Sequence, residues 1–170
     1  MSLRTIHTFP DPVLRQKARK ITEFDETLQP LISDMVETMY DAPGIGLAAP
    51  QIGESVQLIV LDVSKEKEDQ KFMVMINPEI TEHEGNQIDE EGCLSVLDLT
   101  ASVKRSRKIT VTYLDISGKE QKLTTEERFA VVLQHEIDHL NGILFIDHLS
   151  SLKRALYKKK MKKMLASKKR

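Results

Sequence analysis

The sequence predicts one globular domain of mixed helices and strands, built around a helix that is buried on all sides. The chain has 170 residues, enough for one domain with a hydrophobic core and too few for two of ordinary size. Several β-branched runs are bounded by turn residues, which is typical of strands. The segment Phe129-Ala-Val-Val-Leu133 is apolar on every face. Such a helix belongs in a core, covered by sheet on more than one side.

The N-terminal half is predicted to contain an amphipathic helix and a buried strand. Residues 28–40 carry apolar side chains at three- and four-residue steps, which indicates a helix with one face toward the core. The pattern stops at Asp41-Ala42-Pro43-Gly44. A loop of small residues, 44–53, follows, and the β-branched run 56–63 is interpreted as a buried strand.

The second half is predicted to contain a hairpin followed by the core helix. Strands are expected at 72–76 and 109–114, and the turn at 115–118 leads to a partner strand near 120–123. Thr124 followed by Glu127 matches a capping box, and Asn141-Gly142 supplies a stop signal. The core helix should therefore run from about 125 to 141.

The C-terminal segment, about 150–170, is strongly basic. Residues 153–170 hold ten Lys or Arg and no acid, which leaves a net charge of −11 on the remainder. A helix is predicted over 150–165, with its lysines facing solvent or a polyanion. A solvated, frayed terminus is the alternative. The helix should dock on the body through a thin apolar stripe: Leu152, Leu156, Met161 and Leu165.

Composition narrows the class of protein. The start of the chain lacks the apolar stretch of a signal peptide, and no apolar run approaches the roughly 20 residues of a membrane span. One cysteine rules out an internal disulfide. We therefore expect a cytoplasmic protein in which residues 1–170 form a single domain.

The predicted core helix carries the pattern His135-Glu136-Ile137-Asp138-His139, or H-E-x-x-H. On a helix the two histidines lie about 40° apart and one turn along, so both imidazoles can meet one metal ion. Glu136 points about 100° away from His135, outside the ligand set but within reach of a metal-activated water. Polar groups placed directly after an apolar run are costly in a core unless something satisfies them. These features predict a metal site with Glu136 as general base.

The third ligand decides the class of this site. A histidine six residues after His139 would indicate a metzincin, but that position is Phe145, and no acidic residue follows Asp147 to act as in a thermolysin-like enzyme. Cys93 is then the best candidate. A Cys-His-His set leaves a fourth position for water, as in catalytic zinc sites. The remaining histidines lack ligand spacing and are expected to be packed or solvated: His7, His83 and His148.

The glycine-containing loop also matches a relaxed dinucleotide-binding pattern. Residues 44–49 fit G-x-G-x-x-A, but that fingerprint needs a strand before it and a helix after it. Here a helix precedes and a strand follows, so we expect no nucleotide cofactor. Small residues also permit close approach by an extended peptide.

Three segments together resemble the peptide deformylase family: GIGLAAPQ at 44–51, EGCLS at 91–95 and QHEIDH at 134–139. The resemblance implies an α+β fold, with antiparallel β-sheets wrapped around a central helix that carries the H-E-x-x-H pattern, and with N-terminal and C-terminal helices. It also implies a metal-dependent hydrolase that removes the formyl group from the N-terminal formylmethionine of nascent polypeptides and releases formate.

The resemblance assigns roles to individual residues. The metal ligands are Cys93, His135 and His139, with Glu136 moving protons between the attacking water and the leaving amine. The Gln51 side-chain amide and the Leu94 backbone N–H would stabilise charge on the formyl oxygen. Contacts with the substrate are implied for three further residues: Ile45, Gly46 and Glu91.

The identity of the metal does not follow from the ligands, because thiolate and imidazole suit zinc, iron, nickel and cobalt. The resemblance implies Fe²⁺ in the cell, with Zn²⁺, Ni²⁺ or Co²⁺ also able to occupy the site in purified protein.

Two positions depart from the family pattern. Leu97 stands where the family usually has Pro, and Asp98 and Leu99 follow it. Arg128 lies seven residues before His135, about 20° from it on the same helix face, where relatives commonly carry an aliphatic residue. If its charge reaches the methionine pocket, apolar side chains should bind less well there.

Two other functions are compatible with the sequence. One is a small zinc peptidase that applies the same chemistry to internal peptide bonds. The other is a ribosome- or RNA-associated binding protein that uses the basic tail. Ribosome contact through this C-terminal helix is also expected of a deformylase, which must meet its substrates as they emerge.

Overall fold

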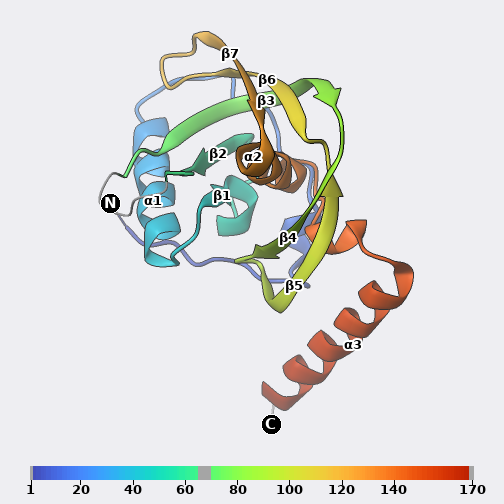
Figure 1. The fold of residues 1–170 in the computed structure, drawn as a ribbon. Helices are drawn as coiled ribbons and strands as arrows, with labels where there is room; N and C mark the ends of the chain where they lie inside the picture. The colour runs from blue at the N-terminus through green and yellow to red at the C-terminus, as the bar shows by residue number, and fades with distance from the viewer. Residues whose placement is uncertain (1, 65–69, 169–170) are drawn as a thin grey trace.

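The computed structural model describes residues 2–64 and 70–168. This part of the chain forms a five-stranded sheet, a two-stranded sheet and three α-helices (Figure 1). All strand pairs in both sheets are antiparallel. The predicted α+β class with antiparallel sheets is therefore confirmed. No helix in the described ranges is long and apolar enough to cross a membrane.

The larger sheet has the strand order β1-β2-β3-β6-β7. Its strands are β1 (Gly46–Ala48), β2 (Leu58–Leu61), β3 (Met73–Glu84), β6 (Lys108–Leu114) and β7 (Glu120–Glu126). The smaller sheet pairs β4 (Gln87–Cys93) with β5 (Val96–Arg105). The predicted hairpin at 115–118 joins β6 to β7, with Gly118 at φ +82°. A positive φ suits glycine because it has no Cβ.

Burial of β2 on both faces explains why its sequence is a continuous apolar run. Successive side chains of a strand point to opposite faces, and both faces of β2 are covered. Leu58 and Val60 belong to the core cluster that includes α1 (Leu28–Asp41), whereas Ile59 and Leu61 belong to the cluster that includes α2 (Glu127–Leu140). The two helices therefore lie on opposite sides of this strand.

Helix α2 occupies the middle of the molecule, seen nearly end-on in Figure 1. It contacts β1, β2, β6 and β7. Ala130 and Leu133 are fully buried and pack with residues of the larger sheet, including Met75 and Val111. Its all-apolar run is thus accounted for by contacts with several strands. The H-E-x-x-H residues lie in its last two turns.

The predicted capping box at the start of this helix is wrong. Thr124 belongs to β7, and its Oγ1 lies 2.9 Å from Thr110 Oγ1 across the ladder. The N-cap residue is Glu126, whose side chain makes no capping hydrogen bond. Pairing with β6 extends β7 as far as Glu126, so long-range strand pairing overrides the local helix signal.

Other strand predictions need correction. The supposed loop at 44–53 contains β1 and a 3₁₀ helix, Ala49–Ile52. β3 continues well past the predicted end at residue 76, through polar residues that pair with β6. The β4–β5 pair was not predicted, because much of its surface is polar and solvent-facing and lacks a clear apolar alternation.

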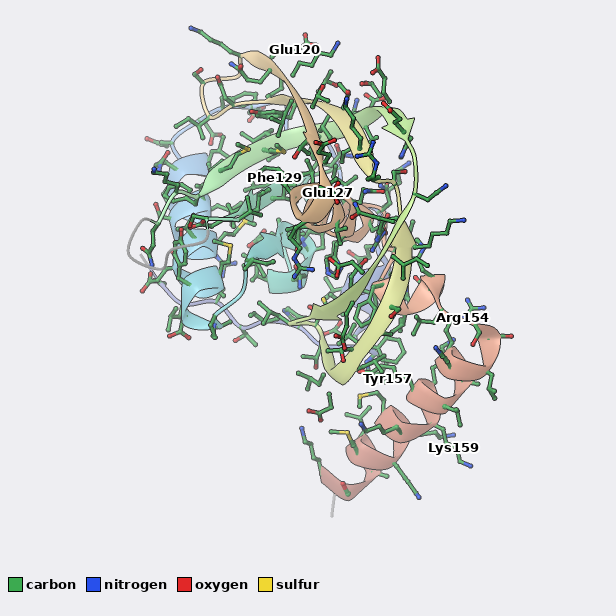
Figure 2. All side chains as sticks on the ribbon, viewed as in Figure 1. Glu120, Glu127, Phe129, Arg154, Tyr157 and Lys159 are labelled. Carbon is green, nitrogen blue, oxygen red and sulfur yellow. The ribbon has the colours of Figure 1, made fainter. Side chains whose placement is uncertain are left out.

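The C-terminal helix α3 (Ser151–Lys168) forms as predicted but docks through a different face. Tyr157 and Met161 are buried, whereas Leu152 and Leu156 are 69% and 59% exposed and Leu165 is also exposed. The predicted stripe is therefore wrong except at Met161. Figure 2 shows Tyr157 on the side of α3 toward β5 and Lys159 on the outer side.

Candidate metal centre

A thiol and two imidazoles come together where the smaller sheet meets α2. Cys93 ends β4, and His135 and His139 lie one turn apart on α2. One ligand atom from each lies within 4.8 Å of the others, and Cys93 Sγ is 3.4 Å from His139 Nε2. Among the His, Cys, Asp and Glu side chains of the described residues, these three form the group that lies close enough together to share a metal ion. One thiolate and two imidazoles fit a divalent transition metal.

His135 is oriented by a buried ion pair. Its Nδ1 lies 2.9 Å from Glu91 Oε1, which leaves Nε2 for the ligand cluster. Arg105 donates two hydrogen bonds of 2.9 Å to the Glu91 carboxylate and a third to Asp138. Burial alone would raise the pKa of Glu91, but the hydrogen bonds from Arg105 and His135 lower it to about 2. Glu91 is therefore a charged acceptor at neutral pH.

Gln51 is held beside Cys93 by two hydrogen bonds. Its Oε1 accepts from the Ala48 backbone N–H at 2.9 Å, and its Nε2 donates to Ser95 Oγ at 3.0 Å. The same Nε2 lies 3.7 Å from Cys93 Sγ. Because the carbonyl end is tied to the Ala48 backbone, the amide nitrogen is held between Ser95 and the Cys93 thiol.

Glu136 is buried next to Gly46. A Cβ added at Gly46 would lie 2.6 Å from Glu136 Oε1, so no larger residue fits without displacing the carboxylate. Glu136 Oε2 is buried without a hydrogen-bond partner in the described part of the molecule. Burial raises the pKa of Glu136 to about 7. A carboxyl group with such a pKa can both accept and return a proton near neutral pH.

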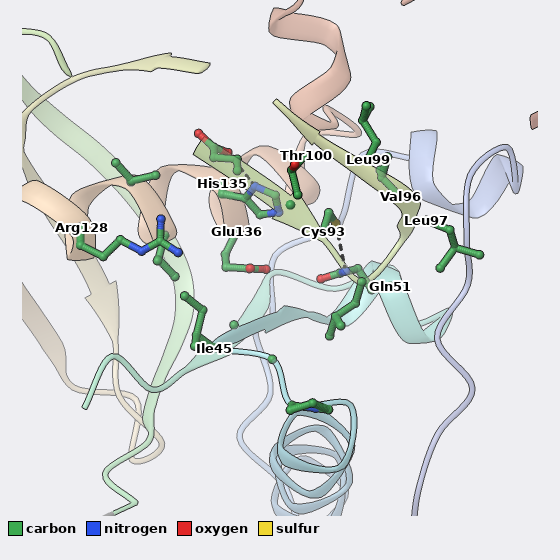
Figure 3. A pocket seen from close by; sticks show the side chains of 18 of the residues that line it. Ile45, Gln51, Cys93, Val96, Leu97, Leu99, Thr100, Arg128, His135 and Glu136 are labelled. Carbon is green, nitrogen blue, oxygen red and sulfur yellow. Dashed lines mark hydrogen bonds and ion pairs between the residues drawn. The ribbon is translucent and has the colours of Figure 1, made fainter. Parts of the chain in front are cut away.

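A cavity of about 670 Å³ opens over these groups. In Figure 3, Arg128 and Ile45 lie at one end of it and Leu97 at the other, with Cys93, Gln51 and Glu136 between them. Gly46, Glu91 and Leu94 also line it. All the candidate site residues except His139 therefore line one cavity, and the buried His139 joins Cys93 and His135 in the ligand cluster. Both carboxylate oxygens of Glu91 are engaged by Arg105 and His135.

The sequence did not reveal Arg105, Ser95 or Asp138 as part of this site. Arg105 is buried, and a buried arginine is normally paired. Arg105 lies at the end of β5, a strand that was not predicted, so its burial could not be recognised from the sequence. Of the other histidines, His7 bonds to Asp11 and His83 to Ser106, away from the ligand cluster. His148 is no candidate ligand, but it contacts Asp138 and Arg105 at the outer side of this network.

Comparison with known proteins gives consistent matches. The family model for polypeptide deformylase matches residues 3–155. A peptide deformylase of Desulfotalea psychrophila is 65% identical over 164 residues, covering 96% of this chain and 97% of the relative. One of Mesorhizobium japonicum is 50% identical over 169 residues, covering 99% and 96%.

Solved structures agree in fold. The peptide deformylase of Legionella pneumophila superimposes with a TM-score of 0.90 at 47% identity, covering 99% of each chain. That of Synechococcus elongatus, in complex with actinonin, has a TM-score of 0.86 at 40% identity and covers 92% of this chain and 86% of its own.

Proposed function

Because this chain belongs to the polypeptide deformylase family and removes the N-terminal formyl group of nascent peptides, we propose roles for the residues around its Cys-His-His cluster. Cys93, His135 and His139 hold the metal on which this family depends. The observation that carries the proposal is the convergence of one thiol and two imidazoles beside a buried carboxylate, at the floor of a cavity. Residues 1–170 form one catalytic domain.

The metal is proposed to be Fe²⁺, with Zn²⁺, Ni²⁺ or Co²⁺ able to replace it in purified protein. When bound, the metal acidifies water and polarises the formyl carbonyl. Metal analysis of anaerobically prepared protein, combined with activity after loading with each ion, tests this assignment. An Fe²⁺-loaded sample no more active than the zinc form would contradict it.

Glu136 is proposed to move the protons of the reaction. As a carboxylate it takes a proton from the attacking water, and it then gives this proton to the amine that leaves. The raised pKa supports both steps, since a carboxyl group with an ordinary pKa would return the proton poorly at neutral pH. The unpartnered Oε2 supplies an acceptor on the buried carboxylate.

Gln51 and Leu94 are proposed to stabilise the negative charge that develops on the formyl oxygen. The Gln51 amide is held in one orientation by Ala48 and Ser95, so little reorganisation is needed when charge develops. Leu94 follows Cys93 directly, which places its backbone N–H in the same turn as the thiol.

Ile45, Gly46 and Glu91 are proposed to act at the methionine end of the cavity. Ile45 is partly exposed and lines that end, where it offers an apolar surface. Gly46 allows the backbone of β1 to approach both Glu136 and an extended substrate. Glu91 lines the same region, but its hydrogen bonds support a further role in orienting His135.

Ribosome contact is proposed for the outer face of α3. Its lysines are exposed, including Lys158, Lys159, Lys162 and Lys163, and the net charge of the preceding residues is negative. Deletion of residues 153–170 should weaken ribosome binding more than activity on a free formyl peptide. Replacing the four lysines by Gln is a cleaner test, because Tyr157 then stays in place. Unchanged ribosome affinity at low salt would contradict the proposal.

The function itself is tested by incubating the metal-loaded protein with formyl-Met-Ala-Ser and, separately, with unformylated Met-Ala-Ser. We expect formate from the first peptide and no cleavage of the second. Cleavage of internal bonds without formate release would instead indicate a small zinc peptidase.

A further inference from the structure

The cavity wall opposite Arg128 is an irregular part of β5. Cys93 pairs with Val96 and Glu91 pairs with Ala101, so Gly92 alone on β4 faces residues 97–100 of β5. We call residues 97–100 the β5 bulge. Within it Asp98 has φ +58°, an uncommon conformation for a residue with a side chain. Extra residues in a bulge interrupt the ladder and leave backbone groups to be satisfied elsewhere.

Two side chains of α3 reach the carbonyl groups of the β5 bulge. Tyr157 donates its phenolic hydrogen to the Leu97 backbone oxygen at 2.9 Å, and Lys160 Nζ lies 3.4 Å from the Asp98 backbone oxygen. These bonds join residues about 60 positions apart. The C-terminal helix thereby supports a segment whose four residues all line the cavity.

Tyr157 is well fixed for this contact. It is 4% exposed, its ring centroid lies 5.7 Å from that of Phe9, and it shares a core cluster with Val96 and Met161. Burial raises the pKa of Tyr157 to about 12, so the phenol remains a donor at neutral pH. The ring is therefore anchored independently of the hydroxyl, and removing the hydroxyl should leave the docking of α3 intact.

We infer that Tyr157 is a positioning residue that holds the β5 bulge as the binding wall for the peptide residues following formylmethionine. The inference rests on the proposed function, in which the formyl group meets Cys93 and Glu136 and the methionine side chain faces Ile45. The opposite end of the cavity, formed by the β5 bulge, is then the surface left for the rest of the peptide (Figure 3).

The test compares a short and a longer substrate in Tyr157→Phe. The KM of formyl-Met-Ala-Ser-Ala should rise about five-fold relative to that of formyl-Met-Ala, as expected for loss of one net hydrogen bond, with kcat unchanged. The matched control is Tyr113→Phe, because Tyr113 lies on β6, away from the cavity lining. Lys160→Gln should shift the same KM ratio by a smaller factor.

Amide hydrogen exchange supplies a readout independent of catalysis. Exchange within the β5 bulge should accelerate in Tyr157→Phe and stay unchanged in Tyr113→Phe. An unchanged KM ratio, or an equal rise for both substrates, would overturn the inference. If the wild-type protein released no formate from either peptide, the proposed function would fail instead.

Discussion

His135 Nδ1 lies 2.9 Å from Glu91 Oε1, and this contact joins the helix that carries two candidate metal ligands to the strand that carries the third. Arg105 holds the same carboxylate from the other side. The orientation of the His135 ring is therefore set by a charged pair outside the ligand cluster.

Glu91→Gln should weaken metal binding by about 10- to 100-fold, the usual cost of losing a carboxylate that orients a histidine ligand. Metal affinity would be measured by competition with a chelator. Glu90→Gln is the matched control, because its side chain is exposed on the same strand. Equal metal retention in the two variants would contradict the role given to Glu91.

Cys93→Ser should abolish normal metal retention, because a serine hydroxyl is a far poorer ligand than a thiolate for these ions. Metal content after gel filtration and formate release from formyl-Met-Ala-Ser are the measurements. A fully active variant with a stoichiometric metal would overturn the ligand assignment.

Glu136→Gln should lower kcat by about 10²- to 10⁴-fold with the metal retained, since it removes the proton carrier and leaves the ligands in place. In the wild-type protein the base must be a carboxylate. As pH rises through the pKa of about 7, kcat/KM should therefore increase. A pH profile with no inflection between 6 and 8 would argue against Glu136 as the base.

Gly46→Ala should reduce kcat/KM by at least about ten-fold, because the new Cβ would lie 2.6 Å from Glu136 Oε1 and displace the carboxylate. Gly44→Ala is the comparison: its Cβ would meet the end of the flexible Leu94 side chain at 2.8 Å. The effect at Gly44 should be smaller. Similar losses in both variants would indicate a general disturbance of β1.

Arg128→Leu should change the ratio of turnover for formyl-Met and formyl-norleucine peptides by less than about two-fold. The Arg128 Nη1 atom lies 2.9 Å from Asp89 Oδ2, and its side chain is more than half exposed, so its charge is held at the rim. Solvent-exposed ion pairs of this kind contribute little to stability, because water and salt screen their charges. A large change in the ratio would show that the charge reaches the methionine pocket, as the sequence position suggested.

Much of the fold could be predicted where the signal is local. The spacing of apolar residues over 28–40 and the turn at 115–118 depend on neighbouring residues, and both predictions are confirmed. The start of α2 was misplaced because Thr124 and Glu127 satisfy a local capping rule that pairing with β6 overrides. The β4–β5 pair was missed because much of its surface is polar, and because its buried residues Val96 and Val103 pack against residues far along the chain, such as Phe145.

For the candidate site, the sequence by itself determined which atoms could bind a metal. His135 and His139 are one helical turn apart, and Cys93 was identified by excluding the other third ligands. Only the tertiary structure decided that Arg105 and Glu91 orient His135 and that Tyr157, not the leucine stripe, docks α3. These contacts join residues 14 to 60 positions apart, so their partners are set by how sheets and helices pack, which no local spacing records.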